Sequence, residues 1–303
     1  MKVASIGECM IELSQMSDGV FARGFGGDTL NTAVYLARLG IDTTYVTALG
    51  DDALSDAMIT SWNAEGIATR EVLRVAGALP GLYMIERDAN GERSFLYWRS
   101  QAPARRFFDL ADDATLERLT RFDWLYLSGI SLSLYPDSGL ERLFALLKTT
   151  RDRGGRIAFD GNFRPRGWPD RATAQRTFNR LLPLVDLALP TGEDEQALFG
   201  DSDAVATISR LASAGVGEIV VKRGPDGCLI AANGETYDVA PPVIVSPVDT
   251  TAAGDSFNAG YLAARIRKAS IRDAALAGHR LASAVIMSPG ALIARDRMPP
   301  ASL

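Results

Sequence analysis

Residues 249–258 combine a threonine-rich turn, three small residues and a carboxylate ahead of a helical apolar pattern. Ala252, Ala253 and Gly254 have little or no side chain, so a ligand can approach their backbone N–H groups closely. The positive end of a helix dipole would face the same place, which predicts an anion site. Asp255 lies beside that site, where a carboxylate can accept a hydroxyl proton during phosphoryl transfer. An Asp-Ser pair is also common N-cap chemistry, so these residues alone leave catalysis and capping as equal alternatives.

Composition limits the kinds of protein that could carry this site. The chain has 303 residues, 47% of them hydrophobic, which is enough for one large α/β domain. A net charge of −5 argues against a nucleic-acid partner. No apolar run approaches the roughly 20 residues needed to span a bilayer, and the N-terminus leads directly into a strand, so we expect no membrane partner and a cytoplasmic location. Two distant cysteines and the single His279 leave no zinc cluster.

The first part of the chain predicts alternating strands and helices. Val3 to Ile6 is an apolar run typical of a buried strand, and a helical spacing follows Gly27. Residues 43–49 form a β-branched strand pattern, and residues 51–65 a helix. This β-α-β-α order favours a doubly wound, mainly parallel sheet covered on both faces.

A hairpin signal interrupts this series. The turn sequence Asp-Ala-Asn-Gly at 88–91 is flanked by two strand-like runs. We interpret it as part of a small β-sheet lid, contributed by residues 11–25 and 80–108 of a single domain, 1–303. Arg99, after the second run, would then reach the site. On local sequence alone, a solvated surface arginine is the favoured interpretation of Arg99.

Two further polar segments lie at the ends of predicted elements, one before a helix and one after a strand. The Gly26-Gly27 pair lets backbone approach a polyol, and Asp28 and Asn31 could hydrogen-bond its hydroxyls. A plain turn with an N-cap is the alternative. The loop 160–168 follows a strand and is rich in Asp, Asn and Arg, at a position where open α/β sheets bind ligands.

A third segment is acidic. Residues 193–195, Glu-Asp-Glu, could help to hold hydrated magnesium, although an acidic first helical turn is the commoner explanation. Farther on, Lys222 ends a strand before a Pro-Asp-Gly turn, and neither a P-loop nor a dinucleotide fingerprint is present.

Taken together and in order, these motifs resemble the ribokinase-like (PfkB) family of carbohydrate kinases over essentially the whole chain. The matching residues are Gly26-Gly27 with Asn31, Asp160-x-Asn162-x-Arg164, Lys222-x-Gly224, and the run from Asp249 to Asp255. The resemblance implies a ribokinase-like fold whose β lid in many relatives also packs against a partner subunit, so a homo-oligomer, a dimer or higher, is expected.

The resemblance also implies roles for residues. Asp255 matches the catalytic base, with the anion hole at Ala252, Ala253 and Gly254. Positions on the sugar side are Gly27, Asp28, Asn31, Tyr97, Arg99, Arg164 and Asp255. Positions near ATP are Asn162, Arg164, Lys222, Gly224, Gly227, Ala252 and Gly254. Asp194 would support Mg²⁺ indirectly, and Asp249 matches a position associated with a monovalent cation such as K⁺.

The strings around Gly7–Leu13, Gly24–Asn31, Leu79–Tyr83 and Tyr97–Arg99 resemble family members that phosphorylate the terminal hydroxyl of 2-keto-3-deoxygluconate. Such a sugar acid carries a carboxylate, which Arg99 and Arg164 are expected to grip, because guanidinium groups bind carboxylates in a bidentate manner. A kinase for another sugar such as fructose, or for a nucleoside, is the alternative. A non-catalytic sugar or nucleotide sensor is the third interpretation.

The chain departs from the family pattern at two places. The anion-hole motif begins with Ala252 where Gly is usual, and its methyl group is expected to be tolerated through a negative φ. The family's Asn-x-x-Glu motif appears here as Thr191 to Asp194, which leaves Glu193 and Glu195 without an assigned role. His279 would border the nucleotide or be a packed helical histidine.

Overall fold

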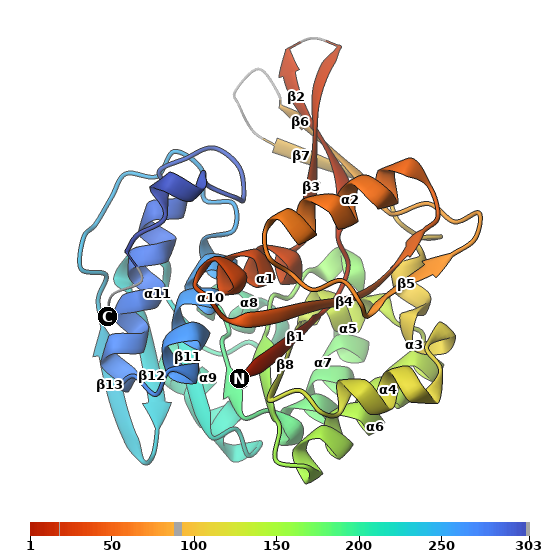
Figure 1. Cartoon of the computed structure of the whole chain (residues 1–303). Helices are drawn as coiled ribbons and strands as arrows, with labels where there is room; N and C mark the ends of the chain where they lie inside the picture. The colour runs from red at the N-terminus through yellow and green to blue at the C-terminus, as the bar shows by residue number, and fades with distance from the viewer. Residues whose placement is uncertain (18, 88–92, 301–303) are drawn as a thin grey trace.

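The computed structural model describes residues 1–17, 19–87 and 93–300. Within them, the main element is a nine-stranded sheet, above which a smaller sheet projects in Figure 1. From one edge to the other, its strands are β13 (Glu235–Val239), β12 (Cys228–Ala232), β11 (Glu218–Lys222), β10 (Leu187–Ala188), β9 (Arg156–Asp160), β8 (Trp124–Ser128), β1 (Lys2–Ile6), β4 (Asp42–Gly50) and β5 (Val72–Val75).

The strands from β11 to β5 are parallel, and only β12 and β13 at one edge are antiparallel. In the centre, Val3 of β1 pairs with Thr43 of β4 on one side and with Trp124 of β8 on the other. The central strands are buried on both faces, as expected of a parallel sheet. The predicted doubly wound, mainly parallel sheet is confirmed.

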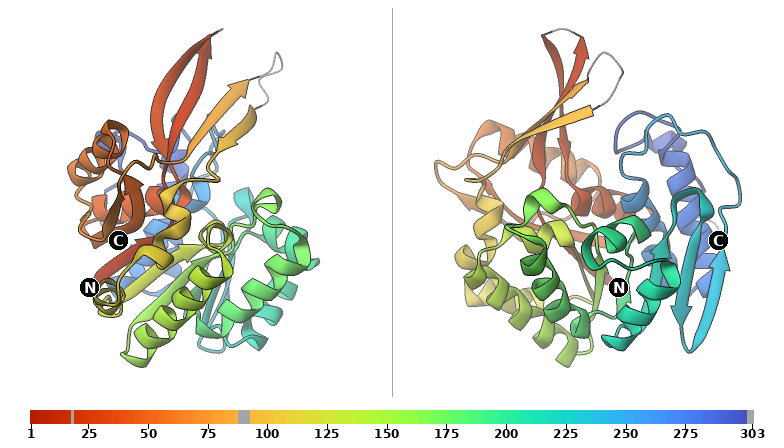
Figure 2. Two further views of the ribbon diagram at one scale, coloured as in Figure 1. Left: turned by 90° about the vertical axis from the view of Figure 1, so that its right-hand side faces the viewer. Right: turned by 180° about the vertical axis from the view of Figure 1, so that it is seen from behind.

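Helices cover both faces of the main sheet (Figures 1 and 2). One face packs against α1 (Asp28–Arg38), α2 (Ala53–Ala64), α10 (Ala253–Ile266) and α11 (Ile271–Val285). The other packs against α3 (Phe107–Leu110), α4 (Asp113–Leu119), α5 (Gly129–Leu134), α6 (Asp137–Asp152), α7 (Arg171–Leu181), α8 (Gly192–Phe199) and α9 (Ala204–Ser213). The core is therefore two apolar layers separated by the sheet.

Local sequence sets several helix ends. The Asp52 side chain accepts hydrogen bonds from the N–H groups of Leu54 and Ser55, which starts α2 close to the predicted residue 51. Ser128 and Ser131 form a capping box at the start of α5, directly after β8. Gly200, at φ 82°, ends α8 in the left-handed conformation that glycine adopts readily.

The second sheet is formed by the two segments expected to make the lid. Its order is β3 (Val20–Gly26), β2 (Met10–Ser17), β6 (Leu82–Arg87) and β7 (Arg93–Trp98), with only β2 and β6 parallel. The predicted turn at 88–91 lies outside the described residues. The sheet ends at Trp98, and Phe107 and Phe108 belong to the core under the main sheet. The expected lid segment 80–108 is therefore longer than the sheet itself.

The order of the strands places a crevice beside β1. The chain passes from β1 to β4 on one side, and later enters β8 on the other side of β1. Ligands of open α/β sheets bind outside the carboxyl ends of the strands at such a reversal. Ile6, Ser128 and Asp160 end β1, β8 and β9 at this edge.

Candidate active site

Asp255 lies in the first turn of α10, with its side chain buried at the carboxyl edge of the sheet. The Asn31 amide donates a 2.8 Å hydrogen bond to Oδ2 of Asp255, and the Thr32 hydroxyl donates to the Asp255 carbonyl oxygen. Burial raises the pKa of the Asp255 carboxyl to about 8, and the negative charge of Asp28 adds to the rise. A carboxyl with this pKa can take up and release a proton near neutral pH.

The turn before Asp255, where an anion site is predicted, leaves backbone donors without acceptors. Helix α10 begins at Ala253 without a side-chain cap. The Ala253 N–H donates to the Thr250 carbonyl, whereas the Gly254 and Asp255 N–H groups have no acceptor among residues 1–17, 19–87 and 93–300. Two free donors and the positive end of a helix dipole therefore face the same place.

Ala252 has φ 60° and ψ 18°, which is left-handed backbone. The expectation of a negative φ at this position is wrong. A methyl group in this conformation costs about 1–2 kcal/mol relative to a relaxed residue. The turn therefore keeps the backbone shape that glycine favours, although this chain has alanine there.

Behind the anion site lies a buried polar cluster. The Lys222 ammonium donates to Oδ1 of Asp160 at 3.2 Å and to Oδ1 of Asn258 at 3.0 Å. The Asn258 amide donates to Oδ2 of Asp160 at 2.7 Å. A side chain added to Gly254 would place its Cβ 3.4 Å from the Lys222 ammonium. Lys222 thus contributes positive charge next to the anion site from inside the protein.

Asp28 and Asn162 close the other side of the site. The Asn162 amide donates to Oδ2 of Asp28 at 2.7 Å, and Asn162 itself has φ 32°. Burial raises the pKa of Asp28, while hydrogen bonds from Ser128 and Asn162 oppose the rise. Both residues were predicted to contact ligands, and the structure brings them together with Asp255.

A cavity of about 1580 Å³ opens between the second sheet and the carboxyl edge of the main sheet. Of the residues predicted for the sugar side, it is lined by Gly27, Asp28, Tyr97, Arg99 and Arg164. Asn31 and Asp255 lie behind this lining, linked to each other. Of the residues predicted for ATP, only Arg164 lines the cavity. The structure thus separates the predicted sugar residues from most of the predicted ATP residues.

Arg99 lines the cavity but is not a free guanidinium. It forms an ion pair with Glu8, whose side chain is 1% exposed. Burial raises the pKa of Glu8, and the charges of Arg99 and Arg105 oppose the rise. Sequence reasoning missed Glu8, although an acidic residue directly after an apolar strand was the available signal. Binding of a substrate carboxylate by Arg99 stays a prediction, and Glu8 is a partner that was not foreseen for this arginine.

Arg164 is also paired. Its guanidinium contacts Asp194 at 3.0 Å, and the arginine side chain is 57% exposed. Burial raises the pKa of Asp194, which also senses the charges of Asp160 and Lys222. Asp194 therefore lies within reach of the charges around Lys222, and its support of magnesium stays a prediction. In the part of the chain described, no group of three or more Asp, Glu, His or Cys side chains could hold a metal ion.

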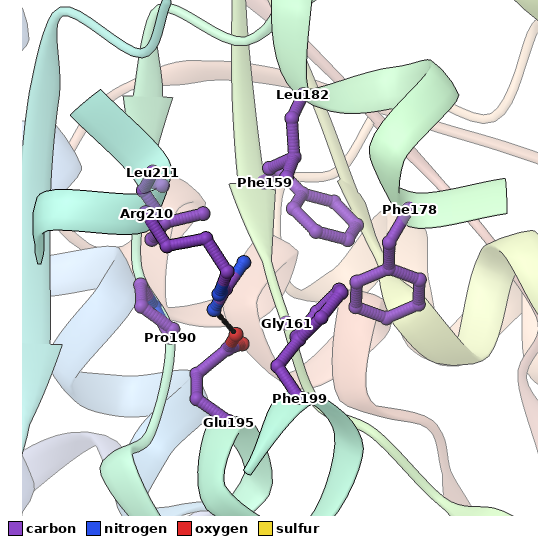
Figure 3. A pocket seen from close by; sticks show the side chains of 10 residues that line it. Phe159, Gly161, Phe178, Leu182, Pro190, Glu195, Phe199, Arg210 and Leu211 are labelled. Carbon is purple, nitrogen blue, oxygen red and sulfur yellow. Dashed lines mark hydrogen bonds and ion pairs between the residues drawn. The ribbon is translucent and has the colours of Figure 1, made fainter. Parts of the chain in front are cut away.

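Glu195, next to Asp194, has a different partner. Figure 3 shows its carboxylate bound to Arg210. Both residues, with Gly161, line a small pocket of about 10 Å³. Arg210 also contacts Asp201 at 2.7 Å and stacks on the Phe199 ring. A space of this size holds roughly one water molecule, so this pocket supports the loop below the site and does not bind a substrate.

Both oxygens of Asp249 accept hydrogen bonds: Oδ1 from Thr251 and Oδ2 from the Gly290 N–H at 2.9 Å. These bonds shape the turn before Ala252, and a role of Asp249 toward a monovalent cation stays a prediction. Gly224 and Gly227 lie in the turn between β11 and β12 at φ 59° and 86°. Both glycines therefore fit the shape of that turn, and their contact with ATP stays a prediction.

His279 is a packed residue of α11. Its Nε2 lies 3.0 Å from the Val239 carbonyl oxygen and 3.5 Å from the Cys228 sulfur, and its ring packs edge-on against Phe257. Burial lowers the pKa of His279, so the ring is neutral at physiological pH. The packed alternative for this histidine is the one that the structure shows.

Comparison with known proteins agrees with this architecture. The family model for pfkB family carbohydrate kinases matches residues 1–297, and the chain belongs to this family. The chain is 46% identical to the 2-dehydro-3-deoxygluconokinase of Escherichia coli strain K12, covering 98% of this chain and 99% of the relative. It is 45% identical to the 2-dehydro-3-deoxygluconokinase of Dickeya dadantii strain 3937, covering 98% of each.

Solved structures share the fold. A fructokinase from Xylella fastidiosa with bound ATP has a TM-score of 0.85 at 24% identity, covering 98% of this chain and 95% of the other. A structure from Escherichia coli in complex with ATP and Mg²⁺ has a TM-score of 0.85 at 22% identity, covering 96% and 94%. Among the described residues, no helix is long and apolar enough to cross a membrane.

Proposed function

We propose that this protein is an ATP-dependent kinase that phosphorylates the terminal hydroxyl of 2-keto-3-deoxygluconate, also called 2-dehydro-3-deoxygluconate, to give the 6-phosphate. The observation that carries the proposal is the position of Asp255. This buried carboxyl, with its pKa raised to about 8, lies beside two N–H groups at the start of α10 that have no acceptor in the described part of the chain. The two relatives at 45–46% identity, both 2-dehydro-3-deoxygluconokinases, support the choice of substrate.

In this mechanism, Asp255 accepts the proton of the attacking hydroxyl, and Asn31 holds its carboxylate through the 2.8 Å hydrogen bond. The Gly254 and Asp255 N–H groups stabilise the charge that develops on the transferring phosphoryl group. Lys222 adds positive charge from behind the turn. Asp28 and Asn162 form the wall between the sugar and the phosphate side.

The residues also fit a magnesium ion held mainly by ATP phosphates and water, as is usual for this ion. Asp194 is the carboxylate that would bind its hydration shell, because it is partly exposed and senses the charges of Asp160 and Lys222. When bound, magnesium offsets the negative charge of the phosphates. For a monovalent cation such as K⁺, Asp249 stays the proposed position.

The alternative is a kinase for a neutral sugar such as fructose. The Arg99–Glu8 ion pair favours this alternative. Glu8 already balances the charge of Arg99, so the cavity does not need an acidic substrate to balance it. An ADP-release assay with ATP and magnesium tests the choice among 2-keto-3-deoxygluconate, fructose, ribose and adenosine. A strong preference for the keto-deoxy acid is expected. Turnover of a neutral substrate alone would overturn the assignment, and no turnover of any would favour a sensor.

We also propose a cytoplasmic homodimer that associates through the second sheet. The support is the exposure of apolar side chains on one face of β7, where Leu96 and Trp98 are 43% and 56% exposed. Exposed apolar side chains that lie together commonly mark an interface. Light scattering is expected to give twice the mass of one chain, and Leu96→Lys to shift it toward the monomer. A monomeric mass for the unmodified protein would contradict the dimer.

A further inference from the structure

The ion pair between Glu8 and Arg99 raises the question of what binds a carboxylate in the cavity. Glu8 is buried and its carboxyl group forms an ion pair with Arg99, so the first partner of Arg99 is Glu8. A neutral pair attracts an anionic ligand weakly. Another positive group at the same end of the cavity is required if the substrate is a sugar acid.

Arg105 is such a group. It lies on the 3₁₀ turn Pro103–Arg106 that follows the second sheet, and it lines the same cavity as Glu8 and Arg99. Its positive charge opposes the rise of the Glu8 pKa. Among the described residues, Arg105 has no hydrogen-bond or ion-pair partner for its guanidinium. One carboxylate and two arginines leave one positive charge, which matches one ligand carboxylate.

Tyr135 provides a second, independent observation. Its side chain is 6% exposed and lines the same cavity, yet its hydroxyl has no hydrogen-bond partner among the described residues. Burial raises the pKa of Tyr135, and the charge of Glu8 adds to the rise. A buried hydroxyl without a partner is costly, and such groups in a binding cavity commonly find their partner in the ligand.

We propose that Arg105 and Tyr135 form the subsite for the carboxylate of the sugar acid, and that Glu8 is a positioning residue that holds Arg99 beside it. The inference rests on the proposed function and adds the residues that select the acid. Arg105 supplies the uncompensated charge and a fork of N–H donors, which suits a planar carboxylate. Tyr135 donates its hydroxyl hydrogen to the same group.

The test compares 2-keto-3-deoxygluconate with 3-deoxyfructose, which has a hydroxymethyl group in place of the carboxylate. Each is measured as a substrate or as a competitive inhibitor. For Arg105→Met, we expect the KM for the acid to rise about 10- to 100-fold, as for a lost hydrogen bond to a charged group. The affinity for 3-deoxyfructose and the KM for ATP should change less than about twofold.

The matched control is Arg106→Met, because Arg106 is the adjacent arginine, is exposed and does not line the cavity. It should leave all constants unchanged. For Tyr135→Phe, the KM for the acid should rise about three- to tenfold, again without effect on 3-deoxyfructose. Thermal unfolding of each variant shows whether the fold is retained, and Arg105→Lys keeps the charge if the methionine variant does not fold.

The outcomes separate the two proposals. If the unmodified protein does not turn over the keto-deoxy acid, the proposed function fails. If it does, but Arg105→Met weakens the acid and 3-deoxyfructose equally, Arg105 is only structural and the carboxylate subsite is overturned. An unchanged KM for the acid in Arg105→Met would overturn it as well.

Discussion

The Asn31 amide donates a 2.8 Å hydrogen bond to the Asp255 carboxylate and thereby joins the beginning of α1 to the beginning of α10. Asn31 was expected to bind the sugar, and the structure gives it a second task. Its N–H stabilises the ionised form of Asp255, which opposes the effect of burial on the pKa. The only other polar atom of the side chain, Oδ1, is buried and has no hydrogen-bond partner among the described residues.

The substitution Asn31→Ala is expected to raise the pKa of Asp255 further, because the carboxylate loses a donor. Less of the base is then ionised at pH 7, so kcat/KM falls and the acidic limb of its pH profile moves up by about one unit. Steady-state kinetics from pH 6 to 10 measure the shift. Activity should recover at the alkaline end, and a loss that is equal at every pH would show that Asn31 acts only on binding.

For Asp255→Asn, we expect kcat to fall about 10²- to 10⁴-fold, because the amide cannot accept the hydroxyl proton. The dissociation constants for ATP and for the sugar acid, measured by calorimetry, should stay within a few-fold of the original values. Asp42→Asn, at an exposed carboxylate of β4 far from the site, is the control. Near-normal turnover would remove Asp255 from the role of base.

The same substitution should also change the pH dependence of stability. The pKa of Asp255 is raised in the folded state, so the proton is bound more tightly there than in the unfolded chain. The protonated Asp255 carboxyl contributes to stability fully below the unfolded pKa of roughly 4. This contribution is lost as pH rises through the folded pKa of about 8. Thermal scans should therefore show Asp255→Asn gaining stability over the original protein between pH 5 and pH 9. A constant difference would argue against a buried proton on Asp255.

Much of the fold could be predicted from sequence because strand and helix periods are local. Val3 to Ile6 and the apolar positions of α1 follow directly from burial on one or two faces. Other elements were missed. β13 (Glu235–Val239) carries Glu, Thr and Asp on an exposed edge, so it shows no apolar run. β10 (Leu187–Ala188) is only two residues long, and proline follows at 190, so its apolar signal is short.

The site was predictable where small residues and carboxylates occupy the ends of elements, as at Gly254 and Asp255. Pairings between distant side chains were not. Nothing local indicates that Glu8 meets Arg99, or that Asp194 and Glu195, adjacent in sequence, pair with different arginines. Such contacts depend on how strands and helices that are distant in sequence pack together, and on which buried charges then need a partner.

Ala252→Gly is expected to stabilise the protein. Ala252 has φ 60°, where a methyl group is strained and glycine is not. Glycine loses more chain entropy on folding, which offsets part of this relief of strain. The net gain in the free energy of unfolding should therefore be about 0.5–1 kcal/mol. Urea unfolding measures it. Ala253→Gly, inside the first turn of α10, is the matched control and should destabilise, by about 0.5–1 kcal/mol.

The last prediction concerns the Glu195–Arg210 pair in Figure 3. Burial raises the pKa of Glu195 to about 7, although Arg210 opposes the rise. Arg210→Met keeps an apolar stem against Phe199 but leaves the carboxylate without its partner. At pH 8.5 the Glu195 carboxylate is ionised in part, and the variant should lose about 3–5 kcal/mol in the free energy of unfolding. At pH 5.5 Glu195 is protonated, so the loss should be clearly smaller.

Urea unfolding of Arg210→Met at both pH values measures this difference, with the double variant Glu195→Gln/Arg210→Met as the control. The double variant has no buried charge at position 195, so it should recover part of the stability at pH 8.5 and show little dependence on pH. Because the Glu195 carboxylate lies under Gly161, the loop that carries Asn162 should also move in the single variant. An equal loss of stability at both pH values would mean that Arg210 acts through Asp201 and Phe199, and that the charge of Glu195 is not what it compensates.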